Sequence, residues 1–129
     1  MFDNELAILG LYGLLVALTI LLQASGAFAQ LGMGYLLSAR DERRSLSGIT
    51  GRIERAVNNS AIAMALFAPA VLILAAKDSF SASSLQAAQL FLIARLVYLP
   101  AYAFGITGLR TLAWLAGFGA TVVLYLLGL

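Results

Sequence analysis

Cysteine and histidine are both absent from the 129 residues of the chain. Without cysteine there is no disulfide, no thiolate metal ligand and no nucleophilic thiol belonging to the protein itself. Without histidine the chain lacks the side chain that most often serves as a metal ligand, haem ligand or general base. We therefore predict no metal site. Any chemistry must use arginine, tyrosine, asparagine or carboxylate side chains, or a group that a ligand supplies.

Charge is also scarce, since charged residues make up 11% of the chain and hydrophobic residues 62%. Such a composition is typical of an integral membrane protein, whose outer surface meets lipid rather than water. The formal net charge of +2 does not indicate nucleic-acid binding, because the basic residues do not gather on an amphipathic or aromatic surface. We expect a lipid bilayer around the protein and no nucleic-acid partner.

Long apolar runs are what the sequence does contain. Polar breaks at residues 38–51, 77–84 and 105–110 separate four such runs. We predict helices over about residues 6–37, 52–76, 85–104 and 109–129, each long enough to cross a hydrocarbon core of roughly 30 Å. Small residues such as Gly13 and Gly117 favour close helix packing. The predicted fold is all-α, with residues 1–129 forming a single four-transmembrane-helix bundle.

The positive charges are distributed unevenly over the connections between these helices. Six arginines surround the first and third connections and one lysine lies in the second: Arg40, Arg43, Arg44, Arg52, Arg55 and Arg110, against Lys77. Because positive charge favours the cytoplasmic side, we expect the first and third connections there, and both termini on the periplasmic side of a bacterial inner membrane. The acidic amino end, with Asp3 and Glu5, argues against a cleaved secretory signal.

Polar residues form a stripe on the second predicted helix. In "GRIERAVNNSAIA", which begins at Gly51, Arg52, Arg55, Asn59 and Ile62 are spaced i, i+3, i+7 and i+10. At 3.6 residues per turn these positions share one face. The polar side chains near the start of this apolar helix therefore lie on one of its faces.

A second stripe lies on the third predicted helix. In "ARLVYLPAY" the residues Arg95, Tyr98 and Tyr102 share a face. Arg95 falls near the middle of the span, where a charge facing lipid costs roughly 2.5–3.5 kcal/mol, so we expect it to face a partner. The candidate partners are Asn58, Asn59, Gln23 and Glu54. Pro100 frees a backbone carbonyl and predicts a kink beside the tyrosines.

Arginines, amides and phenols gathered on the cytoplasmic side suit a small polyanion that carries carboxylates. They do not suit a cation. Arg52 alone is equally explained as a marker of the membrane interface, the asparagines as links between helices and the tyrosines as interfacial belt residues.

These motifs resemble the MAPEG family, the membrane-associated proteins in eicosanoid and glutathione metabolism. The resemblance rests on "RIERAVNN", on "ARLVYLPAY" and on Arg110 at the start of the last helix. It implies a homotrimer with glutathione held between neighbouring subunits near the cytoplasmic side. By this resemblance Arg110 would be catalytic and stabilise the glutathione thiolate, and a further set would bind glutathione: Arg52, Arg55, Asn59, Arg95, Tyr98 and Tyr102.

One departure from the family pattern leaves the function open. The family usually has a glutamate three residues after the asparagine, followed by an aromatic residue, where this chain has Ile62 and Ala63. The leading hypothesis is a glutathione transferase or peroxidase acting on hydrophobic electrophiles. The alternative is a non-catalytic membrane scaffold or accessory subunit with a degenerate glutathione site.

A small four-helix multidrug exporter is a third hypothesis. It requires a carboxylate within the membrane, whereas the candidate carboxylates lie at or near span ends: Asp3, Glu5, Glu54 and Asp78.

Overall fold

The computed structural model of the protein describes residues 2–31 and 48–129. In these ranges the regular structure consists of the helices α1 (Glu5–Leu31), α3 (Gly48–Ala76), α4 (Ala82–Ala103) and α5 (Thr107–Gly128). The expected extension of the first helix to residue 37 lies outside the described residues, as do Arg40, Arg43 and Arg44.

All four helices are long and apolar enough to cross a membrane. Large apolar side chains project from the outside of the bundle, and Leu14, Leu112 and Leu126 each have more than 60% of their surface exposed. Such an outer surface is stable in lipid and not in water. The fold is therefore a four-helix membrane bundle, as the composition predicts.

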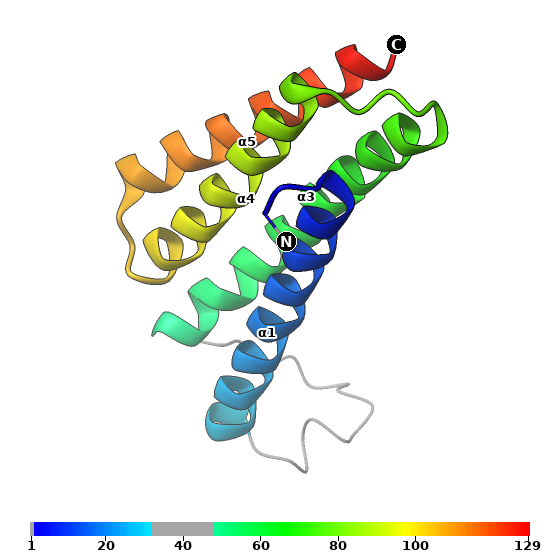
Figure 1. The fold of residues 1–129 in the computed structure, drawn as a ribbon. Helices are drawn as coiled ribbons and strands as arrows, with labels where there is room; N and C mark the ends of the chain where they lie inside the picture. The colour runs from blue at the N-terminus through cyan, green and yellow to red at the C-terminus, as the bar shows by residue number, and fades with distance from the viewer. Residues whose placement is uncertain (1, 32–47) are drawn as a thin grey trace.

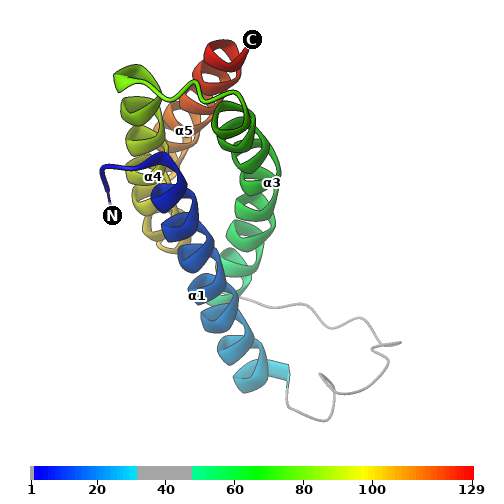
Figure 2. The same cartoon turned by 45° about the vertical axis from the view of Figure 1, so that its right-hand side comes forward.

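The helices pack as two neighbouring pairs (Figure 1). Helix α1 lies along α3, and α4 lies along α5, while α3 and α4 join the pairs and α1 does not contact α5. Figure 2 shows α1 between α3 and α4, with α5 behind them. Helices α3, α4 and α5 are therefore mutual neighbours within the chain.

Hydrogen bonds fix which helix ends lie together. At one end the Lys77 ammonium donates to the carbonyl of Gly128 at 2.6 Å, and the Gln89 amide donates to the carbonyl of Phe2 at 2.9 Å. The α3–α4 connection and both ends of the chain therefore share one side of the bundle (Figure 1). The opposite side carries the start of α3 and the α4–α5 connection, where Arg52 contacts Ala103.

Helix α4 begins three residues before the predicted start at Leu85, because serine side chains cap it. Ser81 Oγ accepts from the Ser84 amide at 3.2 Å, and Ser84 Oγ accepts from the Ser81 amide at 2.7 Å. This reciprocal capping box satisfies backbone donors at the helix start. The serine-rich stretch that hydropathy marks as a break is therefore partly helix.

Three aromatic rings from different helices form the centre of the bundle. The rings of Phe67 and Phe91 stack at 3.9 Å, and Tyr12 meets Phe91 edge to face at 4.8 Å. The Tyr12 hydroxyl is satisfied by the carbonyl of Ser60 at 3.0 Å. This cluster fixes α1, α3 and α4 against one another beside Arg95.

Candidate functional site

Arg95 is the largest fully buried side chain of the described residues, with 2% of its surface exposed. It lies on α4 and reaches across to α3. Its Nη1 donates to Asn59 Oδ1 at 3.0 Å, and its Nη2 donates to Ser60 Oγ at 2.9 Å. The two polar stripes therefore meet inside the bundle, at the contact between Arg95 and Asn59.

Of the four expected partners for Arg95, only Asn59 binds it. Asn58 and Glu54 are exposed, and Gln23 makes no hydrogen bond to Arg95. The second partner, Ser60, was missed by the sequence reasoning. A buried guanidinium has several N–H donors that each need an acceptor. Because Ser60 directly follows Asn59 and is buried on α3, the sequence could have indicated it as a second acceptor.

The groups that contact the Arg95 guanidinium are uncharged. Its guanidinium carbon lies 4.1 Å from the centre of the Tyr98 ring, an attractive cation–π contact. Within the described part of the chain no carboxylate pairs with Arg95, and its buried Nε has no hydrogen-bond partner. A buried cation without a counter-ion is costly in a low-dielectric interior.

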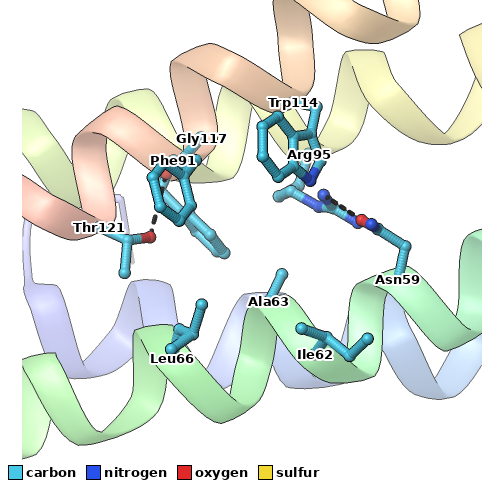
Figure 3. A pocket seen from close by; sticks show the side chains of 10 residues that line it. Asn59, Ile62, Ala63, Leu66, Phe91, Arg95, Trp114, Gly117 and Thr121 are labelled. Carbon is cyan, nitrogen blue, oxygen red and sulfur yellow. Dashed lines mark hydrogen bonds between the residues drawn. The ribbon is translucent and has the colours of Figure 1, made fainter.

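A cavity of about 360 Å³ lies beside this arginine, between α3, α4 and α5. Figure 3 shows Arg95, Asn59 and Trp114 at one end of the cavity, and Leu66, Phe91 and Thr121 at the other. Ile62 and Ala63 also line it. The cavity is therefore a largely apolar space beside an arginine that pairs with no carboxylate of the described residues.

Gly117 lies where α5 packs against Arg95 and Ala94 of α4. A Cβ atom at Gly117 would lie 3.6 Å from Cδ of Arg95 and 3.7 Å from Cβ of Ala94. These are ordinary van der Waals distances, so the aliphatic part of Arg95 packs directly against α5 at this position. Gly117, one of the small residues predicted to favour close packing, is buried in this contact.

Aromatic and cationic groups continue from Arg95 toward the α4–α5 connection. The Tyr98 and Tyr102 rings lie 5.6 Å apart, and the Arg110 guanidinium lies 4.7 Å from the Tyr102 ring centre. Tyr98 is 3% exposed, whereas Tyr102 and Arg110 are half-buried. The row therefore runs from a buried arginine to one that is open at the helix end.

Arg52 closes the same end of the bundle. Its Nη1 donates to the carbonyl of Ala103 at 3.4 Å, and its guanidinium packs against Gly105. Gly105 has a φ of +73°, a conformation that favours glycine, in the turn between α4 and α5. Arg52 thus holds the start of α3 to this turn.

Arg55 is exposed and makes no ion pair or hydrogen bond with the described residues. We call Arg52, Arg55, Tyr102 and Arg110 the arginine end of the bundle. No arginine of this end pairs with a carboxylate in the described ranges. The arginine end is therefore a cationic surface that can accept an anion.

The carboxylates of the described residues lie at the opposite end of the bundle or are exposed. Glu5 is 6% exposed and accepts a hydrogen bond of 2.6 Å from Ser84 Oγ, at the opposite end of the bundle from Arg52. Asp3, Glu54 and Asp78 are exposed. The only carboxylate buried among the described residues therefore sits at a helix end and links α1 to α4.

The fold and the site together define an all-α integral membrane protein with a cationic site at one end of its bundle. The sequence profile of the MAPEG family matches residues 7–129, which include nearly all of α1 and the whole of α3, α4 and α5. The chain therefore belongs to the MAPEG family. A comparison with curated proteins gives no match.

Proposed function

We propose that the protein binds glutathione at the arginine end and uses the thiol in transferase or peroxidase reactions with hydrophobic electrophiles. One observation carries the proposal: Arg52, Arg55 and Arg110 lie near one end of the bundle without carboxylate partners among the described residues. Glutathione has two carboxylates and a thiol, and guanidinium groups bind carboxylates through paired, charge-assisted hydrogen bonds.

The residues of this region would divide the task. Arg52 and Arg55 would bind the carboxylates, and Arg110, oriented by the Tyr102 ring, would lie by the thiol and favour its ionised form. Asn59 offers its amide NH₂ group, since its oxygen is occupied by Arg95. Arg95 and Tyr98 are too buried to meet a ligand at the surface of this subunit, so they would position Asn59 and Tyr102. Glutathione would supply the nucleophilic sulfur.

The absence of an acid at Ile62 changes how the ligand fits. The amino group of glutathione would find no carboxylate at this position, because Ile62 and Ala63 line an apolar cavity. The arginine end accordingly fits the two carboxylates better than the amino group. We expect weaker binding of glutathione than a site with the acid would give, because one charge-assisted hydrogen bond is missing.

The test is turnover by the detergent-purified protein with glutathione and either an activated aryl halide or an organic hydroperoxide. Arg110→Ala should lower glutathione-dependent turnover at least about tenfold, since it removes a charge-assisted contact. Thr111→Ala is the matched control, because the exposed Thr111 hydroxyl bonds only to its own helix, at Thr107. Turnover that is absent in the unmodified protein, or equal in the two variants, would refute the proposal.

We also propose a homotrimer, in which a neighbouring subunit would complete the glutathione site. Its support is family membership together with the exposed apolar faces of the helices. Native mass spectrometry from mild detergent should give the mass of three chains, and a monomer would contradict this assembly.

A second candidate function is a non-catalytic scaffold. Ile62 and Ala63 favour it, because they give an apolar lining in place of the glutamate and aromatic residue expected from the family resemblance. A partner protein that copurifies in fixed stoichiometry, together with no glutathione-dependent turnover, would establish this function in place of the first.

A further inference from the structure

We infer that a second groove, between α1, α3 and α4, binds a neutral apolar alcohol whose hydroxyl group donates to the backbone carbonyl of Leu96. The groove has a volume of about 500 Å³ and shares no lining residue with the cavity beside Arg95. The four residues of the arginine end do not line it either. The inference therefore goes beyond the glutathione proposal and does not depend on it.

Pro100 leaves the carbonyl of Leu96 without its usual helical donor. In an α-helix a carbonyl accepts from the N–H four residues later, but proline at position 100 has no N–H. Leu96 and Pro100 both line the groove, and residues four apart share one face of a helix. The freed carbonyl therefore lies on the groove side of α4, and no side chain of the described residues donates to it.

Thr19 of α1 supplies a second acceptor in the wall of the groove. Its side chain is 8% exposed, and Oγ1 uses its only proton to donate to the carbonyl of Leu15 at 2.7 Å. The threonine oxygen can still accept a hydrogen bond. Since the Leu96 carbonyl also only accepts, a ligand that satisfies these groups must bring the donor.

The two acceptors lie at about the same depth in the bundle. The hydrogen bond between Ser84 and Glu5 joins the starts of α4 and α1. Thr19 follows Glu5 by fourteen residues, and Leu96 follows Ser84 by twelve. At 1.5 Å per residue these positions are about 21 Å and about 18 Å along their helices. Both acceptors therefore face the same part of the groove.

The remaining walls select an uncharged, apolar body for the ligand. They are formed mainly by Leu22, Ile53, Leu99 and Phe104, and no charged side chain of the described residues lines the groove. An anion would be repelled by the two acceptors, and an ammonium group would lose its hydration among apolar walls. A hydroxyl group donates without carrying a charge. The volume falls within the roughly 300–1,000 Å³ of small-molecule sites.

The groove opens on the outer surface of the bundle. Helices α1 and α4 separate from their joined starts toward the arginine end (Figure 1), and Leu22, Leu96 and Phe104 are each more than 45% exposed. Lipid contains no water that could satisfy the Leu96 carbonyl. An acyl chain would fill the groove but offers no donor, whereas an apolar alcohol does both.

A comparison of an alcohol with its methyl ether isolates the donor. We would photolabel the purified protein, in a detergent without hydroxyl groups, with dodecanol that carries a mid-chain diazirine. Unlabelled dodecanol should compete about three- to tenfold better than dodecyl methyl ether, because the two differ by one neutral hydrogen bond. Mass spectrometry should find the label on the groove residues of α1 and α4.

Two proline variants test the acceptor. Pro100→Ala restores the N–H that bonds to the Leu96 carbonyl, so both compounds should still bind but the preference for the alcohol should be lost. Pro69→Ala is the matched control, because Pro69 lies inside α3 and does not line the groove. This variant should keep the preference of the unmodified protein.

Equal competition by dodecanol and its ether would overturn the proposal, as would a label confined to residues outside the groove. A preference that persists in a folded Pro100→Ala protein would overturn it as well. If Pro100→Ala does not fold, Thr19→Val decides, because it keeps the shape of the side chain and removes the second acceptor. The preference should then be weaker, and an unchanged preference would contradict the inference.

Discussion

Arg95 is the residue on which the interior of the bundle is organised. Its two hydrogen bonds join α4 to α3, and its stacking on Tyr98 continues toward Tyr102 and Arg110. Hydrogen bonds to charged groups contribute about 1.5–3 kcal/mol, and a buried charge left without partners costs more than a neutral group. The stability of the site therefore depends on the uncharged side chains that accept hydrogen bonds from Arg95.

Asn59→Ala should accordingly destabilise the protein by about 1.5–3 kcal/mol, because Nη1 of Arg95 loses its acceptor. Asn58→Ala, at the exposed neighbouring position, should change the free energy of unfolding by less than about 0.5 kcal/mol. Both values can be measured by reversible denaturation in detergent micelles. Equal effects of the two substitutions would show that the bond between Asn59 and Arg95 does not stabilise the fold.

The sequence predicts that Arg95 needs a partner but not the complete set of partners. Helical spacing places Asn59 on the correct face, and the cost of a charge in lipid requires Arg95 to turn inward. The contribution of Ser60 depends on the rotation of α3 against α4, which aromatic packing of Tyr12, Phe67 and Phe91 fixes. Because these three residues are far apart in the sequence, no local sequence pattern predicts how their rings pack.

At the scale of the helices, the Ser81–Ser84 turn has two functions. It caps α4, and Ser84 Oγ also donates to the buried Glu5 carboxylate at 2.6 Å, which ties the start of α1 to the start of α4. Hydropathy alone places the start of this helix at Leu85, because serine reads as a polar break. The capping pattern corrects the boundary, whereas the link to Glu5 depends on a contact between residues distant in sequence.

Ser84→Ala should lower stability more than Ser81→Ala. Loss of an N-cap side chain costs about 0.5–2 kcal/mol, and Ser84→Ala in addition leaves Glu5 buried without its donor. Ser83→Ala is the control, since Ser83 is exposed and takes no part in the capping box. Thermal unfolding followed by circular dichroism would rank the three variants, and a Ser84→Ala protein as stable as Ser83→Ala would contradict this role.

At the scale of the whole molecule, the bundle has two unlike ends. One end carries both ends of the chain and Lys77, and the other carries Arg52, Arg55 and Arg110. The arginine-rich end is predicted to face the cytoplasm, because positive charge is retained on that side. The same side holds the cellular pool of glutathione that the proposed function requires.

This orientation can be tested with single cysteines, because the natural chain has none. Ser79→Cys, in the exposed α3–α4 connection, should react with a membrane-impermeant maleimide added outside intact spheroplasts. Thr107→Cys, exposed at the start of α5, should react only after the membrane is permeabilised. The reverse labelling pattern would invert the topology and place the arginine end outside the cytoplasm.

The central claim is that the arginine end binds glutathione, and calorimetric titration of the detergent-purified protein tests it most directly. The unmodified protein should give a saturable heat, Arg55→Ala should bind at least about tenfold more weakly because a charge-assisted contact is lost, and Asn58→Ala should bind like the unmodified protein. No heat at millimolar glutathione, or equal binding by Arg55→Ala, would contradict the claim.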